Sequence, residues 1–359
     1  MIYLSLFNGI SAGRLALSRA GIKFDKYYIA EIDKFANKVS EFHYPDNIQL
    51  GDVNNWREWD IDWSNVGVVT AGFPCQSWSL AGRQLGDKDE RGKLFWTTLE
   101  IMSHVLENNP DAKFMLENVK MKNEFEEYIT LHTERALGYV NKTLINSSLL
   151  SAQNRQRYYW TNFEVSQPED KEILLKDIID DDSITDREKS YCIDANYSKG
   201  TNLNQYFNKS RRQIVFGGAI RGRYNNDGTT SQKLEVRDGG KTNSLTTVQK
   251  DNVVIYQRPR DKNNGGVHTE KSPTLTSNSW EHNNTLQYRK LTPTECARLQ
   301  TFPDGWCENI VSNSQSYKCY GNAWTVDVIA HIFKCAYREN KHEAVRPAVS
   351  YEQSCSANI

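Results

Sequence analysis

The first 160 residues alternate between short apolar runs and segments with helical spacing, which restricts the possible folds more than any other feature. The apolar runs have the length of buried strands, and they cover residues 2–7, 27–31, 66–71 and 113–116. Apolar residues at helical spacing lie between them, at 14–20, 33–42 (with Phe35, Val39 and Phe42 three to four residues apart) and 94–107. Such alternation is typical of a mostly parallel sheet with helices on both faces, so we predict an α/β, Rossmann-like domain.

Three polar stretches come directly after predicted strands, at residues 8–13, 72–76 and 117–119. The first is rich in small residues, although its order Asn-Gly-Ile-Ser-Ala-Gly is not a GxGxxG. In parallel sheets, ligands bind beyond the carboxyl ends of the strands. The sequence therefore predicts that the three stretches share one site.

The composition changes after about residue 160. Residues 161–288 are polar, rich in Asn, Thr, Ser and Gly, and contain two similar strand-like units at 241–247 and 271–276. Helical spacing returns at 294–300 and 325–337. We predict a first part of a catalytic domain at 1–160, a smaller β-rich domain at 161–288, a return to the catalytic domain at 289–340, and a C-terminal tail at 341–359.

Charge is unevenly distributed although the chain has a net charge of only −1. Residues 161–197 hold 4 Lys and Arg against 11 Asp and Glu, whereas residues 199–280 hold 14 against 6. The second segment is basic enough to face phosphates, and a solvated basic surface explains it equally well.

The 7 cysteines include no CxxC pair, so the spacing gives no support to a zinc site, and we predict no metal. Their odd number in a chain of this length favours reduced thiols and an intracellular, cytoplasmic protein. The apolar N-terminus lacks the basic leader and cleavage signal of a secretory peptide. No apolar run approaches the roughly 20 residues of a membrane span.

Four residues have side chains suited to catalysis. Cys75 follows Gly-Phe-Pro on an exposed turn, where a thiolate could act as nucleophile, although isolated cysteines are more often small buried hydrophobes. Glu117 ends a strand, as a catalytic acid or as a solvated carboxylate. Arg155 and Arg157 alternate in Gln-Asn-Arg-Gln-Arg, so both guanidinium groups face one side of a strand, towards an anion or towards solvent.

Taken together, these stretches resemble the DNA (cytosine-5-)methyltransferase family, with its motifs in the usual, unpermuted order. The matching stretches are Leu6-Phe7-Asn8-Gly9-Ile10 (motif I), Glu31 (II), Asp52 (III), Gly72-Phe73-Pro74-Cys75-Gln76 (IV), Glu117-Asn118-Val119 (VI), Gln153 to Arg157 (VIII), Arg289 to Asp304 (IX) and Tyr320-Gly321-Asn322-Ala323 (X). The stretch between motifs VIII and IX is where the family keeps its target-recognition domain. Motif I continues as Ser11-Ala12-Gly13, a variant that resembles the animal de novo enzymes.

The resemblance implies transfer of a methyl group from S-adenosyl-L-methionine to carbon 5 of a flipped-out cytosine in a short sequence of double-stranded DNA. Cys75 would form a covalent adduct with the base, Glu117 would act at ring nitrogen 3, Arg157 would hold the carbonyl oxygen, and Arg155 would lie beside it near a phosphate. The cofactor would contact a set of residues at the strand ends and in motif X: Phe7, Gly9, Ile10, Glu31, Ile32, Asp52, Val53, Pro74, Leu94, Asn322 and Ala323. Within this set, Glu31 would accept from the ribose and Asp52 from the adenine amino group. Ala323 replaces a common Ser or Val, at a cost of about 0.5–1.5 kcal/mol if a hydrogen bond is lost.

DNA contacts are predicted in two places. The stretch from Ser77 to Lys93 is a candidate lid, with Ser77 and Arg83 as candidate DNA contacts. The basic segment offers base or phosphate contacts at Arg221, Arg223, Arg237, Lys241, Arg258 and Arg260. We expect a monomer on DNA, no membrane contact, and a possible cognate restriction endonuclease of a restriction-modification system.

Three other functions fit parts of the sequence. A tRNA cytosine methyltransferase would use the same core and read RNA shape. A catalytically silent DNA-binding module would keep the fold without methyl transfer. An unrelated Rossmann-type oxidoreductase would explain the sheet but not the ordered motifs.

Overall fold

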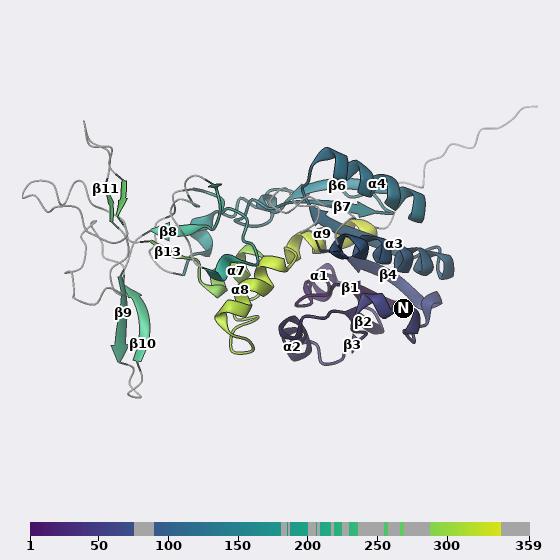
Figure 1. Cartoon of the computed structure of the whole chain (residues 1–359), viewed down its shortest axis with the longest axis horizontal. Coiled ribbons are helices and arrows are strands. Elements are labelled where there is room, and N and C mark those ends of the chain that lie inside the picture. The colour runs from purple at the N-terminus through teal and green to yellow at the C-terminus, as the bar shows by residue number, and fades with distance from the viewer. Residues whose placement is uncertain are drawn as a thin grey trace, which may run out of the picture.

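A seven-stranded, mostly parallel sheet forms the centre of the protein (Figure 1). The computed structural model describes residues 1–74, 90–180, 185, 187–199, 206, 209–216, 219–224, 230–235, 255–257, 266–268 and 288–338. The strand order is β3-β2-β1-β4-β5-β7-β6. Strand β7 runs antiparallel to β5 and β6, and all other neighbouring pairs are parallel. The strands are β1 (Ile2–Leu6), β2 (Lys26–Ala30), β3 (Ile48–Gln49), β4 (Val66–Ala71), β5 (Lys113–Val119), β6 (Asn141–Asn146) and β7 (Gln156–Thr161).

Both faces of the sheet are covered, as the alternation of strands and helices predicts. Alternate residues of β1 show this, because Tyr3 packs in one apolar cluster and Leu4 in the other. The helices α1 (Ala12–Ala20), α2 (Lys34–His43) and α9 (Val326–Ala336) contribute to the Tyr3 cluster. The helices α3 (Glu90–Asn108) and α4 (Asn123–Leu137) contribute to the Leu4 cluster.

The helix predicted at 33–42 is present as α2, but its buried face differs from the apolar spacing. The buried residues are Ala36, Val39 and Ser40, whereas the Phe42 side chain is 68% exposed. Phe42 lies two residues beyond Ser40, roughly 200° further round the helix, so it points away from the sheet.

The helices after residue 289 pack against the first part of the chain. They are α7 (Pro293–Leu299), α8 (Asn313–Asn322) and α9. Helix α9 lies beside α1, and the rings of Phe333 and Tyr3 meet edge to face at 6.4 Å. The indole N–H of Trp306 donates to the carbonyl oxygen of Ile10, 3.2 Å away. Chain segments about 300 residues apart in the sequence therefore form one core.

The intervening segment is only partly described. Its strands form three two-stranded sheets: β8 (Ile214–Phe216) with β13 (Tyr288–Lys290), β9 (Ala219–Tyr224) with β10 (Thr230–Glu235), and β11 (Ile255–Gln257) with β12 (Gly266–His268). Figure 1 shows β9, β10 and β11 well apart from the central sheet. Up to Val215, however, buried residues such as Leu175 and Ile193 belong to the same apolar cluster as Tyr3. The division of the chain at residue 161 stays a prediction.

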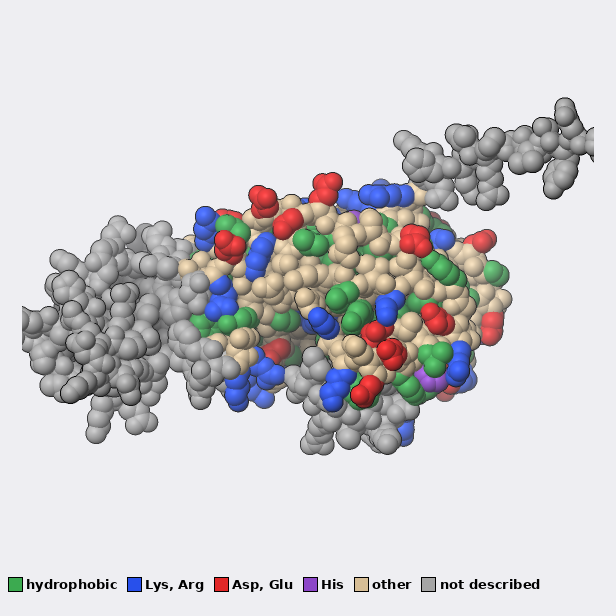
Figure 2. Space-filling view, turned by 90° about the horizontal axis from the view of Figure 1, so that it is seen from above, with side chains coloured by type: hydrophobic (Ala, Val, Ile, Leu, Met, Phe, Trp, Pro, Cys, Tyr) green, Lys and Arg blue, Asp and Glu red, His purple; other side chains and the backbone are tan. Residues whose placement is uncertain are grey.

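Short 3₁₀ helices complete the connections, at η1 (Val53–Glu58), η2 (Trp63–Asn65), η5 (Ser147–Leu149), η6 (Leu175–Ile178) and η7 (Tyr197–Lys199). On the face in Figure 2, Lys and Arg side chains lie among Asp and Glu side chains over the described surface. Of the basic residues counted in 199–280, the structure describes the side chains of Lys199, Lys209, Arg211 and Arg212. The predicted basic face therefore stays a prediction.

The fold depends on a buried ion pair at the start of α7. The carboxylate of Glu295 is fully buried and accepts two hydrogen bonds from the guanidinium of Arg289, both of 2.7 Å. It also accepts from the backbone N–H groups of Thr292 and Asp180. Its removal would take the carboxylate away from the largely buried guanidinium of Arg289 and would remove the acceptor of two backbone N–H groups.

We predict that Glu295→Ala lowers the free energy of unfolding by about 3–5 kcal/mol, because breaking a buried pair strands its partner. The matched control is Asp304→Ala, which removes an exposed partner of Arg298 and should cost about 1 kcal/mol or less. Urea denaturation of the three proteins measures both values. Equal losses in the two variants would contradict the prediction.

Candidate active site

A cavity of about 360 Å³ opens at the carboxyl ends of β1 and β4, where the strand order reverses. From β1 the chain proceeds to β2 on one side, and from β4 to β5 on the other, so the turns after β1 and β4 diverge and leave a crevice. The cavity is lined by all eleven residues that the sequence predicts for the cofactor: Phe7, Gly9, Ile10, Glu31, Ile32, Asp52, Val53, Pro74, Leu94, Asn322 and Ala323. Glu117, Arg155 and Arg157 line it as well.

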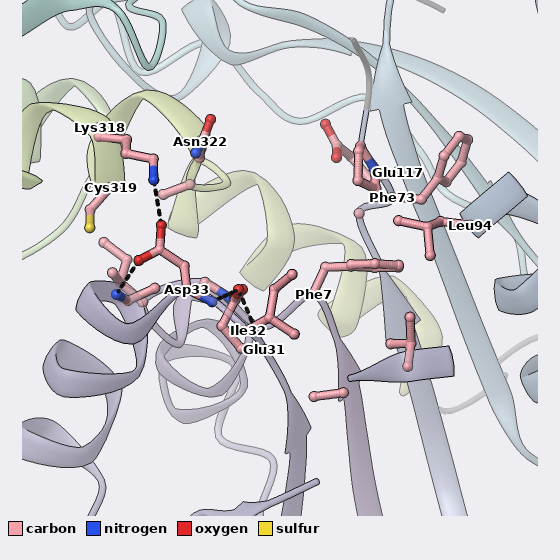
Figure 3. A pocket seen from close by; sticks show the side chains of 18 of the residues that line it. Phe7, Glu31, Ile32, Asp33, Phe73, Leu94, Glu117, Lys318, Cys319 and Asn322 are labelled. Carbon is pink, nitrogen blue, oxygen red and sulfur yellow. Dashed lines mark hydrogen bonds and ion pairs between the residues drawn. The ribbon is translucent and has the colours of Figure 1, made fainter. Parts of the chain in front are cut away.

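The turn after β1 has a strained backbone. Phe7, Gly9 and Ser11 have φ values of 56°, 57° and 64°, in the left-handed region that residues other than glycine rarely adopt. Figure 3 shows the Phe7 ring in the middle of the cavity. The Gly9 N–H donates to Glu31, 2.8 Å away, so this turn is tied to the end of β2.

Glu31 organises the turn that follows β2. One of its carboxylate oxygens accepts from Gly9, and the other accepts from the backbone N–H groups of Ile32 and Asp33, at 2.9 and 2.8 Å. A carboxylate has about four lone-pair sites, so capacity for ligand hydroxyls remains. Ile32 follows with a side chain that is 75% exposed although it lines the cavity.

Asp52 caps the short helix η1. Its Oδ1 accepts from the backbone N–H and the side-chain amide of Asn54, both at 2.9 Å. This cap fixes the carboxylate at the rim of the cavity, beside Val53. Phe73 and Leu94 lie at the opposite end of the cavity from Lys318 in Figure 3.

The sequence did not predict one feature of the rim, an ion pair between Asp33 and Lys318. The two side chains come from the start of α2 and from α8, and their charged atoms are 2.6 Å apart across the cavity wall (Figure 3). Partial burial alone would raise the pKa of Asp33, but the hydrogen bonds from Lys318 and from the backbone of Phe35 outweigh it, so the pKa is lowered. No sequence motif linked these positions, which are 285 residues apart.

Glu117 and Arg157 face each other from adjacent strands. In the antiparallel register of β5 and β7, Glu117 lies opposite Tyr159 and Arg157 lies opposite Val119. The two side chains are therefore diagonal neighbours on one face of the sheet, and Arg157 Nε lies 3.1 Å from Glu117 Oε1. Both side chains are largely buried, with exposed fractions of 13% and 11%.

Arg155, which we expected near a backbone phosphate, is buried by several parts of the chain. Its guanidinium is buried and donates to the Sγ of Cys192 and to the carbonyl oxygens of Ile193, Gly321 and Ala323, at 3.0–3.3 Å. Burial, followed by the charge of Arg157, lowers the pKa of Arg155. A group enclosed in this way is positioned to hold these stretches of the chain together, and its place near a phosphate stays a prediction.

Several predicted residues lie outside the described parts of the chain. The description stops at Pro74, immediately before Cys75, so the structure does not report on Cys75, Ser77 or Arg83. Arg237, Lys241, Arg258 and Arg260 are outside it too, and only the backbone of Arg221 and Arg223 is described, within β9. Their roles stay predictions.

Comparison with known proteins agrees with this geometry. The family model for C-5 cytosine-specific DNA methylases matches residues 1–338. This chain belongs to that family. It is 28% identical to the type II methyltransferase M.HpaII of Haemophilus parainfluenzae, covering 91% of this chain and 86% of that protein. It is 26% identical to the orphan methyltransferase M.SPRI of Bacillus phage SPR, covering 92% and 96%.

A solved structure shows the same fold at lower identity. The Entamoeba histolytica methyltransferase EhMeth superposes with a TM-score of 0.58 at 16% identity, covering 94% of this chain and 98% of that one. The protein is thus a DNA (cytosine-5-)methyltransferase with an α/β, Rossmann-like domain. Among the described residues no cluster of His, Cys, Asp and Glu could hold a metal ion, and none of the described helices is long and apolar enough to cross a membrane.

We predict that Arg155→Lys lowers the free energy of unfolding more than Arg157→Lys does, by about 2 kcal/mol. A lysine has a single ammonium group and cannot satisfy four acceptors on two separate stretches of chain, whereas at position 157 it can still pair with Glu117. Unfolding of both variants in guanidinium chloride measures the difference in the free energy of unfolding. Equal stability of the two variants would show that the Arg155 contacts are energetically unimportant.

Proposed function

We propose that the protein binds S-adenosyl-L-methionine in the cavity between β1 and β4 and methylates a flipped-out cytosine in a short sequence of double-stranded DNA through a Cys75 adduct. The observation that carries the proposal is the convergence, on one cavity, of the family's cofactor residues and of Glu117 and Arg157. Cys75 follows the cavity-lining Pro74 directly in the chain.

The chemistry of the cavity wall suits this cofactor. Phe7, Ile10, Ile32 and Leu94 supply apolar surface for a purine, and a cavity of about 360 Å³ is of the size that small cofactors occupy. Glu31 and Asp52 supply acceptors for ribose hydroxyls and an exocyclic amine. Asn322 supplies an amide for the methionine end. The cofactor supplies a methyl group on a positively charged sulfur.

The protein's own residues make the cytosine reactive. Carbon 5 is a poor nucleophile. Addition of the Cys75 thiolate at carbon 6 makes carbon 5 enamine-like, so that carbon 5 can attack the methyl group. Glu117 donates a hydrogen bond or a proton to ring nitrogen 3, where negative charge develops. Arg157 holds the carbonyl oxygen. Removal of the carbon 5 proton by a base or a water then allows elimination of Cys75.

The ring atoms are inaccessible inside a duplex, so the base has to be flipped out at a cost of a few kcal/mol. The stretch from Ser77 to Lys93 would close over it as a lid. We expect a monomer on DNA in the cytoplasm. The relatives include a type II and an orphan methyltransferase, so a cognate restriction endonuclease is to be sought in the neighbouring genes.

For the cofactor, we predict that Ile32→Ala weakens binding of S-adenosylhomocysteine at least tenfold, because a fully covered Ile side chain contributes roughly 1.5–3 kcal/mol. The matched control is Phe42→Ala. Phe42 is also exposed, at 68% against 75% for Ile32, but it does not line the cavity. Isothermal titration calorimetry should give wild-type affinity for the control. Loss of affinity in both variants, or in neither, would place the cofactor elsewhere.

For the reaction, we predict that the wild-type protein transfers labelled methyl groups from S-adenosylmethionine to unmethylated duplex DNA and that Cys75→Ser abolishes transfer. Bisulfite sequencing should then find the methylated cytosines in one short sequence. Transfer by Cys75→Ser at the wild-type rate would exclude the covalent route.

The same assay separates the alternative functions. Labelling of tRNA and not of DNA would support the tRNA methyltransferase. DNA binding without labelling of either substrate would indicate a catalytically silent DNA-binding protein.

A further inference from the structure

A tryptophan outside the motifs that identified the family reaches Glu117. Trp324 lies between α8 and α9, immediately after Ala323, and 207 residues from Glu117 in the sequence. Its indole N–H donates to Glu117 Oε2 at 3.0 Å. The connection between α8 and α9 thus contacts a carboxylate near the end of β5, in the middle of the sheet.

Two glycines provide the space for this indole. A Cβ on Gly72, at the end of β4, would lie 2.8 Å from Trp324 Nε1 and 3.0 Å from Glu117 Oε2. A Cβ on Gly13, at the start of α1, would lie 3.3 Å from Trp324 Cζ3 and 2.2 Å from Tyr3 Oη. The ring therefore occupies the space that side chains at both positions would need.

The two carboxylate oxygens of Glu117 consequently have different partners. Oε1 faces Arg157 Nε at 3.1 Å, and Oε2 faces Trp324 Nε1 at 3.0 Å. An indole N–H and a guanidinium are donors only, so neither can accept a proton from Glu117.

This asymmetry bears on how Glu117 presents a proton to cytosine. If Arg157 turns to the cytosine carbonyl oxygen, Oε1 is released, whereas Trp324 keeps Oε2 as an acceptor. The proton offered to ring nitrogen 3 is then carried by Oε1, in a fixed orientation. Without the indole N–H, the carboxyl group could rotate and offer either oxygen.

We propose that Trp324 is a positioning residue for methyl transfer, which holds Oε2 of Glu117 so that Oε1 faces the cytosine. The proposal rests on the role of Glu117 proposed above. Trp324 does not itself line the cavity, so its effect should fall on the chemical step and not on binding of cofactor or DNA.

The first test is single-turnover methyl transfer at saturating cofactor and DNA. Trp324→Phe keeps most of the ring and removes the N–H, and it should slow the step about tenfold or more, the worth of a hydrogen bond to a charged group. Dissociation constants for S-adenosylhomocysteine and DNA should stay within about twofold of wild type. A wild-type rate, or a loss explained wholly by weaker binding, would overturn the proposal.

The matched control is Trp56→Phe. Trp56 is a buried tryptophan, whereas Trp324 is partly buried, and the indole N–H of Trp56 meets no acceptor among the described residues. This variant should have the wild-type rate. A second variant, Gly72→Ala, crowds the same contact while retaining both partners and should slow the reaction as Trp324→Phe does. If Trp324→Phe does not fold, a wild-type rate in Gly72→Ala overturns the proposal.

The second test detects the hydrogen bond without any activity measurement. The protein has 9 tryptophans, and the indole ¹⁵N–¹H resonance that disappears in Trp324→Phe belongs to Trp324. Glu117→Gln should shift this resonance while leaving that of Trp56 in place. If Glu117→Gln is as active as wild type, the proposed role of Glu117 fails. If it is inactive and the Trp324 resonance does not move, only the present inference fails.

Discussion

The guanidinium of Arg155 joins three stretches of chain on which the site depends. Its four acceptors belong to Cys192 and Ile193 and to Gly321 and Ala323, so it ties the residue before β7 to the segment beyond this strand and to the end of α8. Burial of a charge is costly unless the charged group is hydrogen-bonded. The Arg155 contacts therefore favour joint assembly of the three stretches. A Cβ on Gly321 would meet the backbone of Asp194 at 2.3 Å, which shows how closely they approach.

This junction explains how chain segments that lie far apart in the sequence can form one cavity. One wall of the cavity comes from turns after β1, β2 and β4, whose geometry is set by the sheet. The other wall comes from α8, about 300 residues later, and is attached by Arg155 and by the pair of Lys318 with Asp33. A cofactor that spans both walls would also stabilise the fold, since it binds only the assembled state.

Sequence patterns predicted the parts of the fold in which local order and hydrophobic spacing agree. The four predicted strands became β1, β2, β4 and β5, and the residues at their ends meet at one cavity. Strands β3 and β6 were not predicted, because they are short or polar edge strands with little apolar alternation. Helix α4 was missed too, since its first residue is preceded by Lys122, which provides no side-chain cap. The Arg155 contacts and the pair of Asp33 with Lys318 depend on tertiary packing, which no local pattern encodes.

The same limit applies to Glu117, whose chemistry depends on what surrounds each of its oxygens. A motif identifies the carboxylate but not the donors that orient it, and here the donors come from β7 and from the connection between α8 and α9. The glycines at 13 and 72 then have a specific meaning in this chain, because the indole of Trp324 fills the space beside them. Gly72 in motif IV and Trp324 beyond motif X therefore take part in the same contact. The orientation of the Glu117 carboxylate is therefore a property of the folded core, and substitutions far from Glu117 in the sequence can alter it.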